Sequence, residues 1–134
     1  MTHTATMLKT YPAEINMDRD QLAKCIDTCY DCAESCTACA DACLSEEMVG
    51  DLRKCIRTCL DCADICETTT HVLSRHTGYD ANLTRAMLQA CIQACRSCYD
   101  ECSRHAGMHE HCRICAEACR MCETTCGDTV AAMR

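Results

Sequence analysis

The chain has 134 residues and a formal net charge of −7, and 19 of its residues are cysteine. Its length suits a single domain, and the acidic balance leaves no basic surface for a nucleic-acid partner. No segment is long and apolar enough to span a membrane, and the first twenty residues hold no apolar run typical of an export signal. We therefore expect a cytoplasmic protein with no membrane partner.

Residues 1–17 differ from the rest of the chain. They contain no cysteine, they hold the only proline, Pro12, and their hydrophobic periodicity is weak. We expect an N-terminal arm or short helix here, followed by a single domain over residues 18–134.

Capping residues predict the first two long helices. Asp18, with Gln21 three positions later, resembles a capping box and predicts a helix from there to Leu44. Ser45 is followed by two glutamates, which predicts that the second helix begins there and runs to about Ser74.

Glycines separate the remaining two helices. Gly78 and Asp80 predict a stop and a new N-cap, and hence a third helix over about 81–105. Gly107 interrupts the pattern again, and a fourth helix is expected from about His109 to Ala132. Because the connections are short, successive helices should be antiparallel neighbours, which predicts an all-α, up-down-up-down four-helix bundle.

The cysteines alternate at spacings of three and four residues. This spacing places them on one face of each helix, where other bundles carry Leu and Ile. Three segments share the pattern C-x3-C-x2-C-x3-C, and the last carries a shifted version of it. We therefore expect a cysteine-lined core, and the candidate metal ligands in it are Cys25, Cys29, Cys32, Cys36, Cys39, Cys43, Cys55, Cys59, Cys62, Cys66, Cys91, Cys95, Cys98, Cys102, Cys112, Cys115, Cys119, Cys122 and Cys126.

A disulfide scaffold is the usual explanation of so many cysteines in a short chain. It fits poorly here, because the cysteine count is odd and the spacing keeps helical register. Packing alone also explains the pattern poorly, since a thiol core invites oxidation. Reduced thiols that bind metal are the better interpretation.

Charge favours Cu(I) among the soft metals. A Zn²⁺ ion held by four thiolates leaves a net charge of −2, whereas each Cu(I) that displaces one thiol proton keeps the core close to neutral. Sulfurs at i and i+4 can share an ion, so many ions per chain should fit. The cysteine run of iron–sulfur proteins is missing. No enzyme is expected, and a zinc or general thiolate buffer and a thiol redox sensor remain as alternatives.

The two ends of the bundle should differ. Leu22, Leu73 and Leu88 predict one closed, apolar end. Imidazole and thioether groups, which suit the arrival and release of copper, should gather at the other end. Charged residues such as Glu101 are expected on the outer faces, where they contribute solvation. The candidate entrance ligands are Met48, His105, Met108, His109 and His111.

These features resemble the bacterial copper storage proteins, in particular their cytosolic branch. The resemblance covers about Asp18 to Met133 and depends on the repeated cysteine pattern and on the His/Met cluster between the third and fourth helices. It implies a homotetramer of four-helix bundles that stores many Cu(I) ions on the core cysteines. His105 and His109 match the entrance ligands, and His111 is a weaker match. Copper ions are then the cargo, and copper chaperones or cuproenzymes the expected protein partners.

Overall fold

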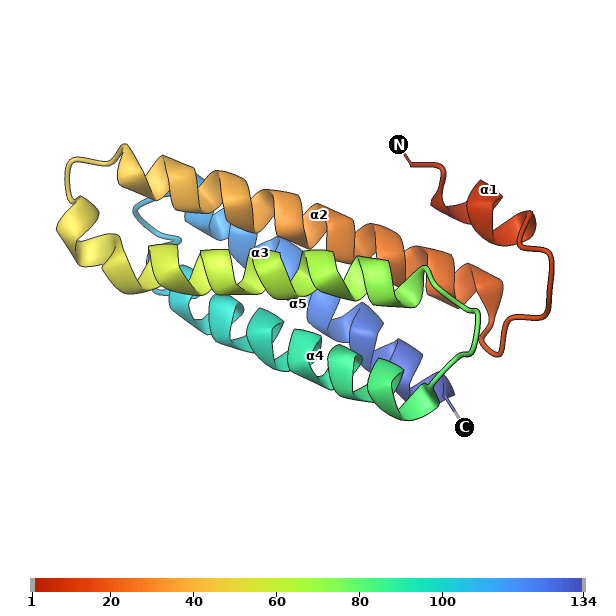
Figure 1. Ribbon diagram of the computed structural model, residues 1–134. Helices are drawn as coiled ribbons and strands as arrows, with labels where there is room; N and C mark the ends of the chain where they lie inside the picture. The colour runs from red at the N-terminus through yellow and green to blue at the C-terminus, as the bar shows by residue number, and fades with distance from the viewer. Residues whose placement is uncertain (1, 134) are drawn as a thin grey trace.

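The computed structural model describes residues 2–133, so Met1 and Arg134, the outermost residues of the two expected segments, lie outside it. Four long helices lie side by side, and a short helix precedes them (Figure 1). Helices and turns, but no strand, occur within residues 2–133, which confirms the all-α prediction. The elements are α1 (Thr4–Lys9), α2 (Arg19–Leu44), the 3-10 helix η1 (Val49–Leu52), α3 (Arg53–Leu73), α4 (Ala81–Ser103) and α5 (Glu110–Ala132).

Across residues 2–133, the helices are all too short or too polar to cross a membrane.

Side-chain caps fix the beginnings of α2 and α4, as predicted. The Asp18 carboxylate accepts a hydrogen bond of 2.9 Å from the Gln21 N–H. The Asp80 carboxylate accepts bonds of 3.0 and 3.2 Å from the N–H groups of Asn82 and Leu83. These bonds satisfy backbone donors that have no partner inside the helix.

The predicted start of the second long helix at Ser45 is wrong. Ser45 is the residue that closes α2, and its N–H bonds to the carbonyl of Ala42. The chain then passes through η1, and α3 begins only at Arg53. A serine followed by glutamates resembles an N-cap in sequence, but the residue before α3 is Leu52, whose complete burial fixes the connection instead.

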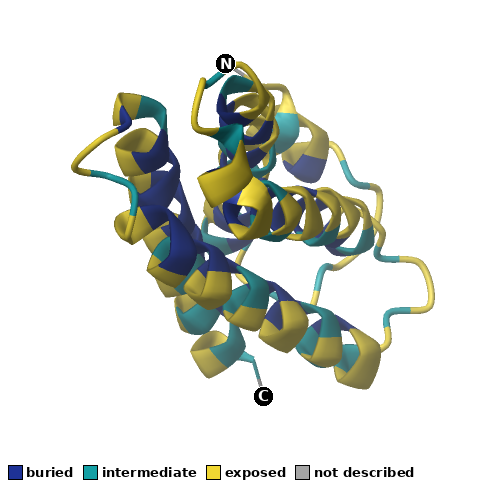
Figure 2. Cartoon of the chain, turned by 90° about the vertical axis from the view of Figure 1, so that its left-hand side faces the viewer, coloured by how far each residue is buried: buried dark blue, intermediate teal, exposed yellow. Residues whose placement is uncertain are grey.

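Cysteine supplies most of the core. Buried residues line the space between the long helices, and exposed residues cover the outer surfaces (Figure 2). Every cysteine side chain is at most 1% exposed. At one end, which we call the leucine end, Leu22, Leu73 and Leu88 are buried and complete the core with ordinary apolar contacts.

Helix α1 packs against α2 near the leucine end. Its Leu8 is buried, and the Arg19 guanidinium donates hydrogen bonds to the carbonyls of Leu8 and Ala13. The Tyr11 hydroxyl lies 3.2 Å from that of Thr77, and its ring meets the edge of His76. The N-terminal segment is therefore folded onto the side of the long helices, at the end opposite the histidines described below (Figure 1).

Candidate metal centre

The core thiols form a network of close contacts. All are free, and neighbouring Sγ atoms lie 3.5 to 4.0 Å apart, far beyond the roughly 2.05 Å of a disulfide. The contacts run without a break along the length of the core. One such path joins Cys25, Cys126, Cys91, Cys66, Cys62, Cys32, Cys36, Cys98, Cys102 and Cys55.

Sulfur atoms also gather in overlapping groups of four. Within each group, the sulfurs all lie within 4.8 Å of one another. Some cysteines, such as Cys32 and Cys36, belong to more than one group, so an ion in one group shares a sulfur with the next. Shared thiolates suit soft ions that accept bridging sulfur. Among the groups are Cys29/Cys91/Cys122/Cys126, Cys32/Cys66/Cys95/Cys122, Cys32/Cys36/Cys62/Cys119 and Cys36/Cys98/Cys115/Cys119.

Burial and neighbouring thiols shift the cysteine pKa values in opposite directions. Burial raises the pKa of Cys43 to about 11, and it also raises the pKa of Cys112. Hydrogen bonds from the thiols of Cys126 and Cys29 lower the pKa of Cys25 to about 4. The core therefore holds thiols that release a proton readily and thiols that keep it until a metal ion displaces it.

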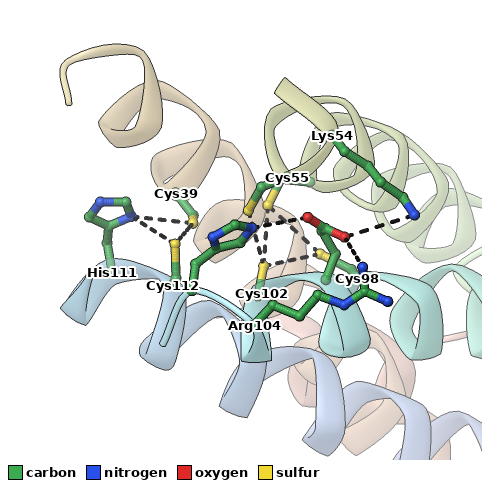
Figure 3. A network of polar contacts seen from close by, with 11 residues as sticks. Cys39, Lys54, Cys55, Cys98, Cys102, Arg104, His111 and Cys112 are labelled. Atoms are coloured by element: carbon green, nitrogen blue, oxygen red, sulfur yellow. Dashed lines mark hydrogen bonds and ion pairs between the residues drawn. The ribbon is translucent and has the colours of Figure 1, made fainter. Parts of the chain in front are cut away.

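The other end of the protein, which we call the histidine end, contains His105, His109 and His111 beside the connections that lead into α3 and α5. Figure 3 shows His111 beside the sulfur atoms of Cys39 and Cys112. Its Nδ1 is 3.4 Å from the Cys39 sulfur and 3.7 Å from the Cys112 sulfur. His111, the weaker match to the entrance ligands of the family, is thus the histidine whose imidazole contacts the two candidate ligands Cys39 and Cys112.

One carboxylate joins His109 and His111. The Glu46 Oε2 atom lies 3.0 Å from His109 Nδ1 and 2.9 Å from His111 Nε2, and the two imidazole rings stack with centroids 5.5 Å apart. The hydrogen bond from His111 lowers the pKa of Glu46, so this carboxylate stays charged. Glu46 therefore holds both rings in place across the end of the core.

His109 has a nitrogen available for a ligand. The residue is 8% exposed, and within residues 2–133 its buried Nε2 atom has no hydrogen-bond partner. An imidazole nitrogen left in this position is a suitable donor for a metal ion.

His105 belongs to a separate charged cluster. Its Nε2 lies 3.0 Å from Glu101, whose carboxylate also meets Arg104 at 3.5 Å and Lys54 at 3.9 Å. Figure 3 shows Lys54 and Arg104 beside Cys55, Cys98 and Cys102. The expectation that Glu101 lies on an outer face is wrong, because the residue is only 6% exposed. Two cations, Lys54 and Arg104, compensate a carboxylate buried at the edge of the thiol network.

The two methionines predicted as entrance ligands, Met48 and Met108, lie outside the buried thiol groups. Met48 is 40% exposed and Met108 is 67% exposed. Both belong to the connections at the histidine end, Met48 just before η1 and Met108 just before α5.

Sequence reasoning missed both carboxylates of the histidine end. Glu46 lies in a connection that the sequence assigned to a helix, so its position relative to α5 could not be seen. Glu101 directly precedes Cys102, and only its three partners, Lys54 on α3 and Arg104 and His105 in the turn after α4, reveal its environment. The one sequence signal was the basic and histidine cluster that follows it at residues 104–105.

A bundle of helices around a network of free thiols, with imidazoles at one end, defines a class of protein that sequesters soft metal ions. The sequence profile of the copper storage protein family matches residues 18–131. The chain belongs to this family.

Solved structures from Streptomyces lividans resemble the chain closely. One is the copper storage protein Ccsp loaded with 10 copper equivalents, at 62% identity and a TM-score of 0.96, with 97% of this chain and 99% of that chain covered. Another describes copper loading to a cytosolic copper storage protein with five coppers, at 64% identity, a TM-score of 0.85 and coverage of 86% and 96%. A third is a Ccsp variant with a histidine replaced by alanine, at 64% identity and a TM-score of 0.86, with 87% of this chain and 98% of that chain covered. The comparison with curated proteins gave no match.

Proposed function

We propose that this protein stores and buffers copper in the cytosol, as many Cu(I) ions per chain bound to core thiolates. The observation that carries the proposal is the unbroken network of buried, free thiols. The Streptomyces lividans relatives support it, because one is loaded with 10 copper equivalents and one is described as cytosolic. A redox sensor needs an accessible, reactive cysteine, whereas every thiol here is buried.

The ligands fall into two roles. The 19 core cysteines bind the stored ions, and Cu(I) replaces one thiol proton at a time so that the core stays near neutral. His109 and His111 receive copper at the histidine end, which their contacts with Glu46 and with the thiols of Cys39 and Cys112 support. His105 and the exposed methionines Met48 and Met108 make the first, weaker contacts with the arriving ion.

The proposed architecture is an antiparallel, up-down-up-down four-helix bundle over residues 18–134, with residues 1–17 as an N-terminal arm that carries the short helix α1 and packs against α2. The short connections and the packing of each long helix on the next support it. The family resemblance adds a homotetramer and exchange of copper with chaperones or cuproenzymes. The protein carries out no catalysis, because storage needs ligands and a path to them but no reacting substrate.

Anaerobic titration of the reduced metal-free protein with Cu(I), in competition with a strong chelator, tests the storage role. We expect binding to continue well beyond the number of histidines and to approach the order of one ion per thiol. Saturation at only a few ions per chain would reject the proposal.

Uptake kinetics test the role of the histidine end. His105→Ala and His109→Ala variants should take up Cu(I) more slowly, with a capacity near that of the parent. His71→Ala is the matched control, since His71 lies exposed on α3. Unchanged stopped-flow rates in both entrance variants would remove this role.

A further inference from the structure

Four residues at the histidine end form a group unlike those inside the core. Cys39, Cys43, His111 and Cys112 place three sulfurs and one imidazole nitrogen within 4.8 Å of one another. We call this group the His111 site. It combines three thiol sulfurs with an imidazole ring, and it lies where the His111 side chain is 26% exposed, whereas the four groups named above consist of sulfur alone.

Three of the four ligand atoms of the His111 site have the spacing of a tetrahedral zinc site. Zinc–sulfur bonds of about 2.3 Å and zinc–nitrogen bonds of about 2.0 Å imply sulfur–sulfur edges of about 3.8 Å and nitrogen–sulfur edges of about 3.5 Å. Cys39 and Cys112 have their sulfurs 3.9 Å apart, and His111 Nδ1 lies 3.4 and 3.7 Å from them. An ion of zinc size can therefore bind these three ligands with little movement, and the Cys43 sulfur lies within 4.8 Å of each of them.

The surroundings of His111 orient it as a metal ligand. Its Nε2 lies 2.9 Å from the Glu46 carboxylate, which accepts the N–H at this nitrogen. The proton is then held on Nε2, and the lone pair of Nδ1 faces the two thiols. A carboxylate that fixes the outer nitrogen of a ligating histidine is the usual support of zinc sites in proteins.

Charge separates the His111 site from the all-sulfur groups. A divalent ion with three thiolates and an imidazole carries a net −1, while four thiolates carry −2 and lie fully buried. Cu(I) gains no comparable advantage here, because it accepts fewer ligands and bridging sulfur.

We propose that the His111 site binds one Zn²⁺ ion per chain, with Cys39, Cys43, Cys112 and His111 as its ligands and Glu46 as the residue that positions His111. This inference does not depend on copper storage, although copper and zinc compete for these ligands when both are present. Zn²⁺ enters as three thiol protons leave, and no electron is transferred.

Cobalt provides the probe, since Co²⁺ adopts zinc-type tetrahedral coordination and reports it in its visible spectrum. The reduced metal-free protein is titrated anaerobically with Co²⁺, which is then displaced by Zn²⁺. We expect the first equivalent to give tetrahedral bands and sulfur-to-cobalt charge transfer, with Zn²⁺ restoring a colourless protein. Glu46→Gln should weaken the first equivalent about 10- to 100-fold, and His111→Ala should weaken it at least as much.

Control variants decide the location of the ion. His71→Ala should leave the first equivalent unchanged, and circular dichroism should show that every variant keeps its helices. A tight first equivalent that survives both Glu46→Gln and His111→Ala would place the ion among the all-sulfur groups and overturn the proposal. The Cu(I) capacity of the same variants is measured separately, so a failure of the zinc site is distinguished from a failure of copper storage.

Discussion

Glu101 places a carboxylate almost entirely inside the protein, where Lys54 and Arg104 compensate its charge and the His105 imidazole lies within hydrogen-bond distance. Removal of one partner from a buried ion pair is costly when the other charge stays buried. Here the cations of Lys54 and Arg104 are 73% and 67% exposed, so water can solvate them once the carboxylate is gone. Removal of the Glu101 carboxylate should therefore cause only a moderate loss of stability.

We expect Glu101→Ala to lower the free energy of unfolding of the metal-free protein by about 1–2 kcal/mol, as for a lost charge-assisted hydrogen bond. Urea denaturation under reducing conditions measures this. Glu117→Ala is the control, because its carboxylate pairs with Arg113 on the surface and is 64% exposed. A similar small effect of both substitutions would contradict the assigned role of Glu101.

The raised pKa of Cys43 makes its contribution to stability depend on pH. Unfolded cysteine ionises near pH 9, whereas folded Cys43 keeps its proton up to about pH 11. A thiol with a raised folded pKa contributes stability below pH 9 that is lost as the pH rises from 9 to 11. The difference in free energy of unfolding between the parent and Cys43→Ala should therefore narrow over this range.

Cys25 provides the opposite control for this experiment. Its pKa is lowered to about 4, so its contribution is present above pH 9 and is lost as the pH falls from 9 towards 4. Anaerobic urea denaturation at several pH values measures both variants. If the difference in free energy of unfolding from the parent changed with pH in the same way for Cys43→Ala and Cys25→Ala, the opposite pKa shifts of the two cysteines would be contradicted.

At the scale of elements, the N-cap of α4 should make a measurable contribution to the free energy of unfolding. The Asp80 carboxylate accepts hydrogen bonds of 3.0 and 3.2 Å from the N–H groups of Asn82 and Leu83. Asp80→Ala should lower the free energy of unfolding by about 1 kcal/mol, the usual value of an N-cap. Asp64→Ala, at an exposed position inside α3, is the control and should change it by less than about 0.5 kcal/mol.

The sequence predicted helices well where a cap or a glycine marked their ends. Asp18 and Asp80 cap α2 and α4 as expected, and α5 begins one residue after the predicted His109. The start of α3 could not be predicted, because it depends on how Leu52 packs into the core after an extra turn. The burial of Leu52 determines where α3 begins, and Ser45 resembles an N-cap only in sequence.

At the scale of the whole molecule, the thiols are already assembled without metal. Cysteine burial and close sulfur contacts are complete in the protein alone, so metal binding requires no new helix. Copper loading should leave the helical circular dichroism unchanged while raising the melting temperature, since ions bind the folded state only. A large gain of helix on loading would show instead that metal organises the core.

The sequence also predicted the burial of the cysteines better than the contacts at the histidine end. The periodicity of three and four fixes the inward face of each helix, so the burial of the cysteines follows directly from it. The roles of His105 and His111 depend on contacts across connections, such as those of Glu46 with two histidines. Helical periodicity carries no information on such contacts.

Cys32 and Cys36 each serve more than one group of four sulfurs, and this sharing sets how the reservoir can be filled. An ion bound to Cys36 in one group of four sulfurs changes the ligands that remain for an ion in the neighbouring group. The groups therefore cannot bind copper as independent, identical sites. Partly filled samples should contain unevenly populated clusters, and a simple equal-site isotherm should fail to describe them.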